Sequence, residues 1–223
     1  MNCRIELTED GSTTFFSDRF GQHYHSIHGA IQESMHVFIE AGYRCVADKP
    51  HVTVFEMGFG TGLNALLTKI EADRLRQPVS YLSVELYPIS TDEACAANYS
   101  EQLGLSDDSF KRIHTAPWGE TILLSEHFSL TKINGDLLAL SLPSGVDLVY
   151  FDAFDQEAQP DLWSEHVFRK IYEAMTPNGI LVTYSSKGVV KEALRAAGFF
   201  VQRLAGPPGK RHMVRAQKQQ ISE

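Results

Sequence analysis

A glycine-rich turn and an acidic residue further along the chain could together bind a nucleotide-like cofactor. The turn Gly58-Phe59-Gly60-Thr61-Gly62 stands between a β-branched run and a helical pattern. Glycines at such a turn let the backbone approach a ligand closely, and the N–H groups at the start of a helix favour a negative group. Glu85 follows Gly60 by 25 positions and ends the next apolar run, where a carboxylate can accept hydrogen bonds from both ribose hydroxyls.

The spacing of the glycines favours S-adenosylmethionine over a dinucleotide as this cofactor. A NAD fingerprint reads G-x-G-x-x-G, but Leu63 stands where its third glycine would be. In addition, Glu56 lies just upstream of the turn, where a carboxylate would repel a pyrophosphate. We therefore assign to cofactor binding the residues Glu56, Gly58, Phe59, Gly60, Gly62, Asn64, Glu85 and Asp136.

Asp136 and Asp152 each follow a further apolar run. Asp136, in Asn134-Gly135-Asp136, could reach the adenine amino group or could simply be a turn residue, and both interpretations stay open. Asp152 ends a strongly apolar run and precedes Ala153-Phe154. Because ligands of open parallel sheets bind at the carboxyl ends of strands, Asp152 is our candidate for the reacting end of the site.

The elements that must position these residues are short apolar runs that alternate with helical patterns, which predicts parallel strands joined by helices. Strands are expected at 51–57, 79–85, 146–152 and 180–184, with a middle strand around 130–133 and another beginning at 199. Helices are expected at 62–76, 91–102, 162–175 and 188–197, the second capped by Ser90. Residues 45–223 are thus predicted to form an α/β, Rossmann-like domain with a mostly parallel sheet. Residues 1–44, with a hairpin around Asp10-Gly11 and a helix at 29–42, are predicted to be an extension packed on it.

Composition narrows the class of protein. A chain of 223 residues with 43% hydrophobic and 22% charged residues fits one globular domain with an appendage and excludes disordered or fibrous classes. No apolar run is long enough for a membrane span and residues 1–6 do not resemble a signal peptide, so we expect a cytoplasmic protein. Three distant cysteines form neither a disulfide framework nor a metal clamp. A metal site at His23, His25, His28 and His36 is not assigned, because no single element would converge their rings.

Charge is distributed unevenly along the chain. The formal charge is −8, made up of −14 in residues 1–183 and +6 in residues 184–223. The C-terminal part could contact a polyanion or could be an ordinary solvated surface. The basic residues concerned are Lys187, Lys191, Arg195, Arg203, Lys210 and Arg211.

Several longer motifs resemble those of one known family. They are Tyr24-His25-Ser26, Phe55-Glu56-Met57-Gly58-Phe59-Gly60-Thr61-Gly62-Leu63-Asn64, Phe151-Asp152-Ala153-Phe154, Pro160-Asp161-Leu162-Trp163, Thr183-Tyr184-Ser185 and Gly209-Lys210-Arg211-His212-Met213. With these motifs the sequence resembles the bacterial tRNA 5-methylaminomethyl-2-thiouridine methyltransferases, which comprise the methyltransferase domain of MnmC and stand-alone MnmD. It departs from them in Asp155, where a DxFxP pattern is common, and in His212, where an acidic residue is usual.

The resemblance implies methyl transfer from S-adenosylmethionine to the amine of 5-aminomethyl(-2-thio)uridine at the tRNA wobble position. Its partners would be tRNA and an enzyme that supplies the aminomethyl-uridine. Some relatives carry a flavin-dependent oxidase as well, but a second dinucleotide fingerprint is lacking, so we expect the methyltransferase half only.

Such a reaction needs a group that orients the amine and takes its proton. We assign that role to Asp152, with Tyr184 beside it, while Tyr24, His25, Phe154 and Ser185 would shape the acceptor pocket and Lys187, Lys210 and Arg211 would contact tRNA. Two alternatives remain: a methyl- or aminopropyltransferase that acts on a small-molecule or protein amine, and a non-catalytic module that binds tRNA or the cofactor.

Overall fold

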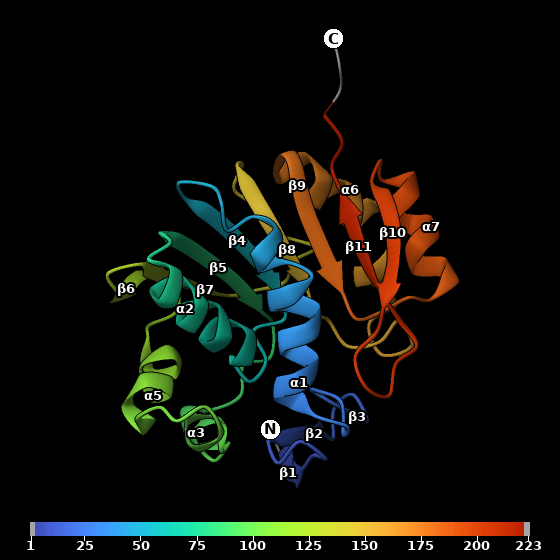
Figure 1. The fold of residues 1–223 in the computed structure, drawn as a ribbon. Helices are drawn as coiled ribbons and strands as arrows, with labels where there is room; N and C mark the ends of the chain where they lie inside the picture. Colours follow the sequence, from blue (N-terminus) through green and yellow to red (C-terminus); the bar gives the residue numbers. More distant parts are fainter. Residues whose placement is uncertain (1–2, 221–223) are drawn as a thin grey trace.

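An eight-stranded sheet forms the centre of the structure, a computed structural model that describes residues 3–220 (Figure 1). Residues 1–2 of the predicted extension and residues 221–223 of the predicted domain lie outside the described residues. The strands run in the order β10-β11-β9-β8-β4-β5-β7-β6. Their bounds are β4 (Val52–Met57), β5 (Val79–Glu85), β6 (Thr121–Ser125), β7 (Phe128–Asn134), β8 (Val146–Phe151), β9 (Met175–Thr183), β10 (Phe200–Ala205) and β11 (His212–Gln217).

The sheet is mostly parallel, as the sequence predicted. Neighbours from β7 through β5, β4 and β8 to β9 pair in parallel, whereas β6 and β11 are antiparallel to the strands beside them. From β4 the chain builds the sheet first towards β5 and β7 and later in the opposite direction towards β8 and β9. This reversal places a crevice at the carboxyl ends of β4 and β8, which is where ligands of such sheets bind.

Helices cover both faces of the sheet because its strands alternate apolar side chains between two cores. On one face, η1 (Met35–Glu40), α2 (Leu63–Leu75) and α5 (Asp107–Thr115) pack over a core that includes Val54 and Tyr150. On the other face, α6 (Glu165–Ala174) and α7 (Gly188–Ala196) pack over a core that includes Phe55 and Phe151. Neighbouring residues of β4 and of β8 thus serve opposite cores.

Residues 3–45 form a small second sheet and a helical segment. The strands β1 (Cys3–Leu7), β2 (Thr13–Ser17) and β3 (Gln22–His23) are antiparallel and lie near the end of the large sheet where β9 finishes (Figure 1). The predicted hairpin around Asp10-Gly11 joins β1 to β2. The predicted helix 29–42 consists of α1 (Ala30–Ser34) and the π-helix η1, followed by the 3₁₀ turn η2 (Tyr43–Cys45). The boundary between an extension and a domain at residues 44 and 45 stays a prediction.

Some elements differ from the sequence-based expectation. The predicted helix 91–102 is two short helices, α3 (Thr91–Cys95) and α4 (Tyr99–Gln102), although Ser90 does cap the first with a capping box. The predicted helix 162–175 begins as the 3₁₀ turn η3 (Pro160–Trp163), and α6 starts only after Ser164, whose hydroxyl accepts from the N–H of Val167. Residues 177–179, which precede the predicted strand at 180–184, lie inside β9, where the pairing with β8 shifts register. Helix α5 and the strands β6 and β11 were not predicted.

No helix in residues 3–220 combines the length and the apolar character that crossing a membrane requires.

Candidate active site

A cavity of about 560 Å³ lies at the carboxyl end of the sheet and extends to the N-terminal segment. Its size is within the roughly 300–1,000 Å³ of small-molecule sites. The residues expected from the sequence that line it are Tyr24, His25, Gly58, Phe59, Gly60, Asn64, Glu85, Asp152, Phe154, Tyr184, Lys187 and Lys210. The structure thus brings most of the predicted site residues into one cavity.

The glycine-rich turn packs tightly against two other parts of the cavity wall. Gly58 has φ +91°, and a Cβ atom there would stand 2.5 Å from the carbonyl oxygen of Asp152. Gly60 has φ +49°, and a Cβ atom there would stand 3.0 Å from the Tyr24 ring. A side chain at Gly58 would displace the backbone of Asp152 and one at Gly60 would press on the Tyr24 ring, so glycine is required by both conformation and space.

Glu85 ends β5 and lines the cavity beside the turn. Its carboxylate accepts hydrogen bonds from the backbone N–H groups of Gly60, at 3.1 Å, and Tyr87, at 2.8 Å. Burial raises the pKa of Glu85, while these backbone donors act in the opposite direction. The side chain therefore holds the turn in place and presents an acceptor to the cavity.

Glu56 lies beneath the turn and does not line the cavity. It is fully buried, and one of its oxygens accepts a 2.7 Å hydrogen bond from the Ser83 hydroxyl while the other has no partner among the described residues. Burial, reinforced by the negative charge of Asp152, raises the pKa of Glu56 to about 8. Glu56 is therefore mostly neutral at pH 7, and the charge repulsion expected from the sequence against a pyrophosphate is largely absent.

Asp152 follows β8 and stands in the cavity wall next to the turn. The Asn64 amide donates a 2.9 Å hydrogen bond to its Oδ2 atom, and this is the one side-chain hydrogen bond of the carboxyl group within residues 3–220. Burial raises the pKa of Asp152 to about 7, with a further contribution from Glu33 and opposing ones from Asn64 and Lys210. A carboxyl group with this pKa can exchange a proton at physiological pH.

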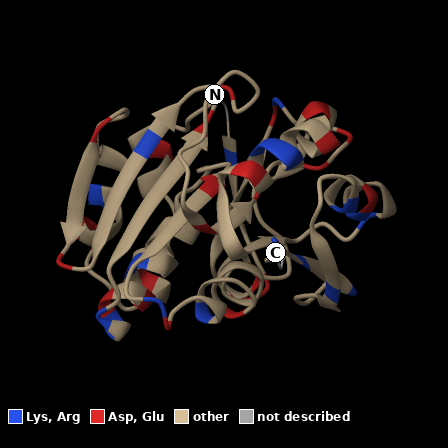
Figure 2. Ribbon diagram, turned by 90° about the horizontal axis from the view of Figure 1, so that it is seen from above, with Lys and Arg blue, Asp and Glu red and all other residues tan. Residues whose placement is uncertain are grey.

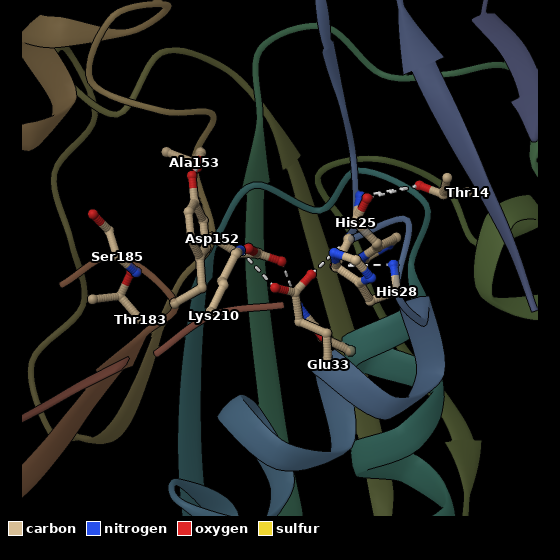
Figure 3. Close-up of polar contacts among 12 residues, drawn as sticks. Thr14, His25, His28, Glu33, Asp152, Ala153, Thr183, Ser185 and Lys210 are labelled. Atoms are coloured by element: carbon tan, nitrogen blue, oxygen red, sulfur yellow. Dashed lines mark hydrogen bonds and ion pairs between the residues drawn. The ribbon is translucent and has the colours of Figure 1, made fainter. Parts of the chain in front are cut away.

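Glu33 is a member of the cavity wall for which the sequence analysis assigned no role. It lies on α1, only 6% exposed, and accepts from the Lys210 ammonium at 2.6 Å and from the N–H of Ser26 at 2.7 Å. The same ammonium lies 3.9 Å from the centroid of the Tyr184 ring. Figure 3 shows Lys210 reaching Glu33 beside Asp152. Lys210, predicted as a tRNA contact, is thus paired with a carboxylate at the cavity.

Aromatic rings form much of the remaining wall. The Tyr184 hydroxyl donates to the carbonyl of Ala153 at 2.9 Å, and burial raises the pKa of Tyr184 well above its ordinary value. Phe154 stacks on Phe20 with ring centroids 4.3 Å apart and meets Tyr24 edge-on at 4.9 Å. Because its hydroxyl is engaged and neutral, Tyr184 offers the cavity a ring face rather than an acid or a base. Phe20, like Glu33, lines the cavity but was not predicted as a site residue from the sequence.

The other predicted residues occupy different surroundings. His25 hydrogen-bonds the Thr61 hydroxyl at 2.8 Å, and burial lowers its pKa to about 4, so its ring is neutral. Lys187 is exposed at the rim and forms a 2.7 Å ion pair with Asp155. Four further predicted site residues do not line the cavity: Gly62, Asp136, Ser185 and Arg211.

No group of three or more His, Cys, Asp or Glu side chains is arranged to hold a metal ion in the part of the chain that the structure describes.

Neutralising Glu56 should remove a pH-dependent loss of stability. Since its pKa is raised from 4.5 to about 8 on folding, its stabilising contribution is complete below about pH 4.5 and is lost as the pH rises through about 8. We expect the Tm of Glu56→Gln, relative to that of the wild type, to increase as the pH rises from 5 to 9. A change in unfolding free energy of about 1 kcal/mol corresponds to roughly 2–4 °C in Tm. The exposed Glu126→Gln is the control, and a Tm difference for Glu56→Gln that does not change with pH would contradict this view.

The cavity side of the turn should control cofactor affinity. Glu85→Gln replaces the carboxylate that would accept hydrogen bonds from the ribose hydroxyls. Because hydrogen bonds to a charged group are lost, we expect S-adenosylmethionine to bind about 10- to 150-fold more weakly. Gly60→Val should abolish binding, because the new side chain would meet Tyr24. Titration calorimetry measures both. Asp136→Asn is the matched variant outside the cavity lining, and a comparable loss there would show that Asp136 contacts the cofactor after all.

Comparisons with known proteins identify the family. The family profile described as S-adenosyl-L-methionine-dependent methyltransferase matches residues 107–219. The tRNA 5-methylaminomethyl-2-thiouridine biosynthesis bifunctional protein MnmC of Polaromonas naphthalenivorans is 32% identical over 98% of this chain and 36% of its own length, and it confirms the resemblance seen in the sequence. The chain thus spans about a third of the length of the curated relatives that it matches.

Solved structures share the fold. The crystal structure of MnmC2 from Aquifex aeolicus matches with a TM-score of 0.78 and 24% identity, over 100% of this chain and 72% of that chain. Spermidine synthase from Thermotoga maritima matches with a TM-score of 0.56 and 14% identity, over 98% of this chain and 73% of that chain. The predicted Rossmann-like methyltransferase fold and the predicted cofactor are confirmed. The chain belongs to the family of S-adenosyl-L-methionine-dependent methyltransferases.

Proposed function

We propose that this enzyme methylates the amine of 5-aminomethyl(-2-thio)uridine at the wobble position of tRNA. The observation that carries the proposal is Asp152, a carboxyl group with a pKa of about 7 that stands in the cavity wall with one oxygen held by Asn64. An amine acceptor needs such a group, because its nitrogen must lose a proton in the reaction. The MnmC relatives are named for the biosynthesis of 5-methylaminomethyl-2-thiouridine in tRNA, and the proposed acceptor is the nucleoside that methylation would convert into it.

The cavity fits S-adenosylmethionine. Glu85 offers an acceptor for the ribose hydroxyls, and residues 58–60 of the glycine-rich turn line the cavity beside it. The buried Oδ1 atom of Asn64 has no partner among the described residues, so a donor is missing at this point of the site. When bound, the cofactor supplies an electrophilic methyl group.

The side chains of the enzyme have three tasks in the proposed reaction. Asp152 accepts a hydrogen bond from the amine and, in its ionised form, takes up the proton that the nitrogen releases. Asn64 keeps the carboxyl group oriented through the 2.9 Å hydrogen bond. The rings of Tyr184 and Phe154 line the same cavity, where aromatic faces stabilise positively charged groups.

The substrate also implies partners and a location. We infer that tRNA is the macromolecular partner, that another enzyme generates the aminomethyl-uridine, and that the protein works in the cytoplasm. Phosphate contacts are best assigned to the exposed Arg203 and Arg211, which form no ion pair within residues 3–220, since Lys187 and Lys210 are each paired with a carboxylate. Desolvation, followed by the charges of Arg203, Arg211 and Lys191, lowers the pKa of His212, so these basic groups lie near one another.

The methyl-transfer assay uses labelled S-adenosylmethionine, tRNA from cells that lack the modification, and nucleoside mass spectrometry. We expect 5-methylaminomethyl-uridine as the product and a rate that rises with pH around a midpoint of about 7, because Asp152 must be ionised. Asp152→Asn should lower kcat by about 10²–10⁴-fold with unchanged cofactor affinity. The exposed Asp108→Asn is the control. Methylation of a small amine but not of tRNA, or full activity of Asp152→Asn, would overturn the assignment.

Charge reversal of the basic pair should weaken tRNA binding. The double variant Arg203→Glu/Arg211→Glu loses two phosphate contacts. The slope of log K against log salt concentration should therefore become shallower by roughly 1.5–2. Lys111→Glu/Arg112→Glu, on α5, is the matched control of equal charge change. Figure 2 shows basic and acidic residues interspersed over the ribbon, so the total charge alone does not single out one surface. Equal salt slopes for both variants and the wild type would mean that RNA is held elsewhere.

A further inference from the structure

A continuous series of aromatic rings leads from the protein surface into the cavity. The guanidinium of exposed Arg19 lies 4.1 Å from the centroid of the Tyr87 ring, and Tyr87 is 5.9 Å from Phe20. Phe20 in turn stacks on Phe154 at 4.3 Å, and Phe154 meets Tyr24 at 4.9 Å. We call these five residues the aromatic ladder.

The ladder is assembled from separate parts of the fold. Arg19 and Phe20 lie in the turn between β2 and β3, Tyr87 follows β5, and Phe154 follows β8. Its inner members Phe20, Phe154 and Tyr24 line the cavity, so the ladder and the cavity form one surface. The N–H of Tyr87 donates to Glu85 at 2.8 Å, which fixes the outer part of the ladder to the cofactor side of the site.

The ladder is neither sealed in the core nor neutralised. Phe20, Tyr87 and Phe154 are all partly exposed. Arg19 forms no ion pair with a carboxylate within residues 3–220, in contrast to Lys187 and Lys210 at the same cavity. A cation that is stacked on a ring and has no carboxylate partner remains available to a phosphate.

We propose that the aromatic ladder binds the unpaired nucleotides next to the target uridine of the RNA loop. The inference rests on the proposed function and deepens it by naming the RNA surface. Unpaired bases stack on aromatic rings and on Arg planes, whereas a duplex buries its base faces in its own stack. The combination of partly exposed rings, a guanidinium without an ion pair in residues 3–220 and direct continuity with the cavity therefore fits a single-stranded loop.

The test measures binding of fluorescent RNAs by polarisation. One RNA is an anticodon stem-loop, and the other is a fully paired duplex of the same length. Tyr87→Ala and Phe20→Ala should each weaken stem-loop binding by roughly 5- to 150-fold and leave duplex binding unchanged. Arg19→Ala, at an exposed position, should lower stem-loop affinity and make its salt dependence shallower by about 0.7. Phe200→Ala, an exposed ring on β10, is the matched control and should have no effect.

Cofactor affinity and Tm are measured on the same variants. Stem-loop binding equal to the wild type in all three ladder variants would overturn the proposal, as would equal losses for stem-loop and duplex. If Phe20→Ala is unstable, Arg19→Ala and Tyr87→Ala decide the question. Methyl transfer to the stem-loop by the wild type is scored separately: normal ladder-dependent binding without transfer would disprove the proposed reaction and support the RNA surface. Absence of stem-loop binding by the wild type would disprove both.

Discussion

The close contact between Gly58 and the backbone of Asp152 is the constraint on which the rest of the site depends. The N–H of Asp152 donates to the carbonyl of Met57 at 2.9 Å, and the N–H of Gly58 donates to that of Val84 at 3.0 Å. These bonds continue the pairing of β4 with β8 and β5 beyond the strand ends, so two loops leave the sheet side by side. The glycine-rich turn and the proposed reacting residue Asp152 can be adjacent only because no Cβ atom separates them.

The same crowding brings four acidic groups together, and each is accommodated differently. Glu33 is paired with Lys210, Glu85 accepts from backbone N–H groups, and Glu56 is kept mostly neutral by burial. Asp152 receives one amide hydrogen bond and no cation. Burial raises the pKa of both Asp152 and Glu56, but of these two only Asp152 lines the cavity, and its pKa of about 7 lets it titrate near neutral pH. The environment, rather than the residue type, distinguishes Asp152 from its neighbours.

The sequence predicted the parts of this arrangement that depend on local pattern. β4, β5 and β8 were found because β-branched and aromatic residues follow one another there, and Glu85 and Asp152 were found because they come directly at strand ends. The predicted helix 91–102 failed because Asn98 bonds the distant Gly11 and Thr13 instead of continuing the helix. Glu33 and Phe20 gave no local signal, since their partners Lys210 and Phe154 are 177 and 134 positions away.

An acidic cavity with tRNA as its proposed substrate must separate two kinds of attraction. Inside, the carboxylates and ring faces favour a positively charged amine, and the nearest lysines are already paired. Phosphates must therefore be attracted from outside, by side chains such as Arg203 and Arg211 that have no carboxylate partner within residues 3–220. That attraction weakens with salt, whereas the stacking of bases on the four rings of the aromatic ladder releases no counterions. In the proposed reaction, charge thus governs how readily the RNA associates, and the rings of the aromatic ladder hold the unpaired nucleotides next to the target uridine.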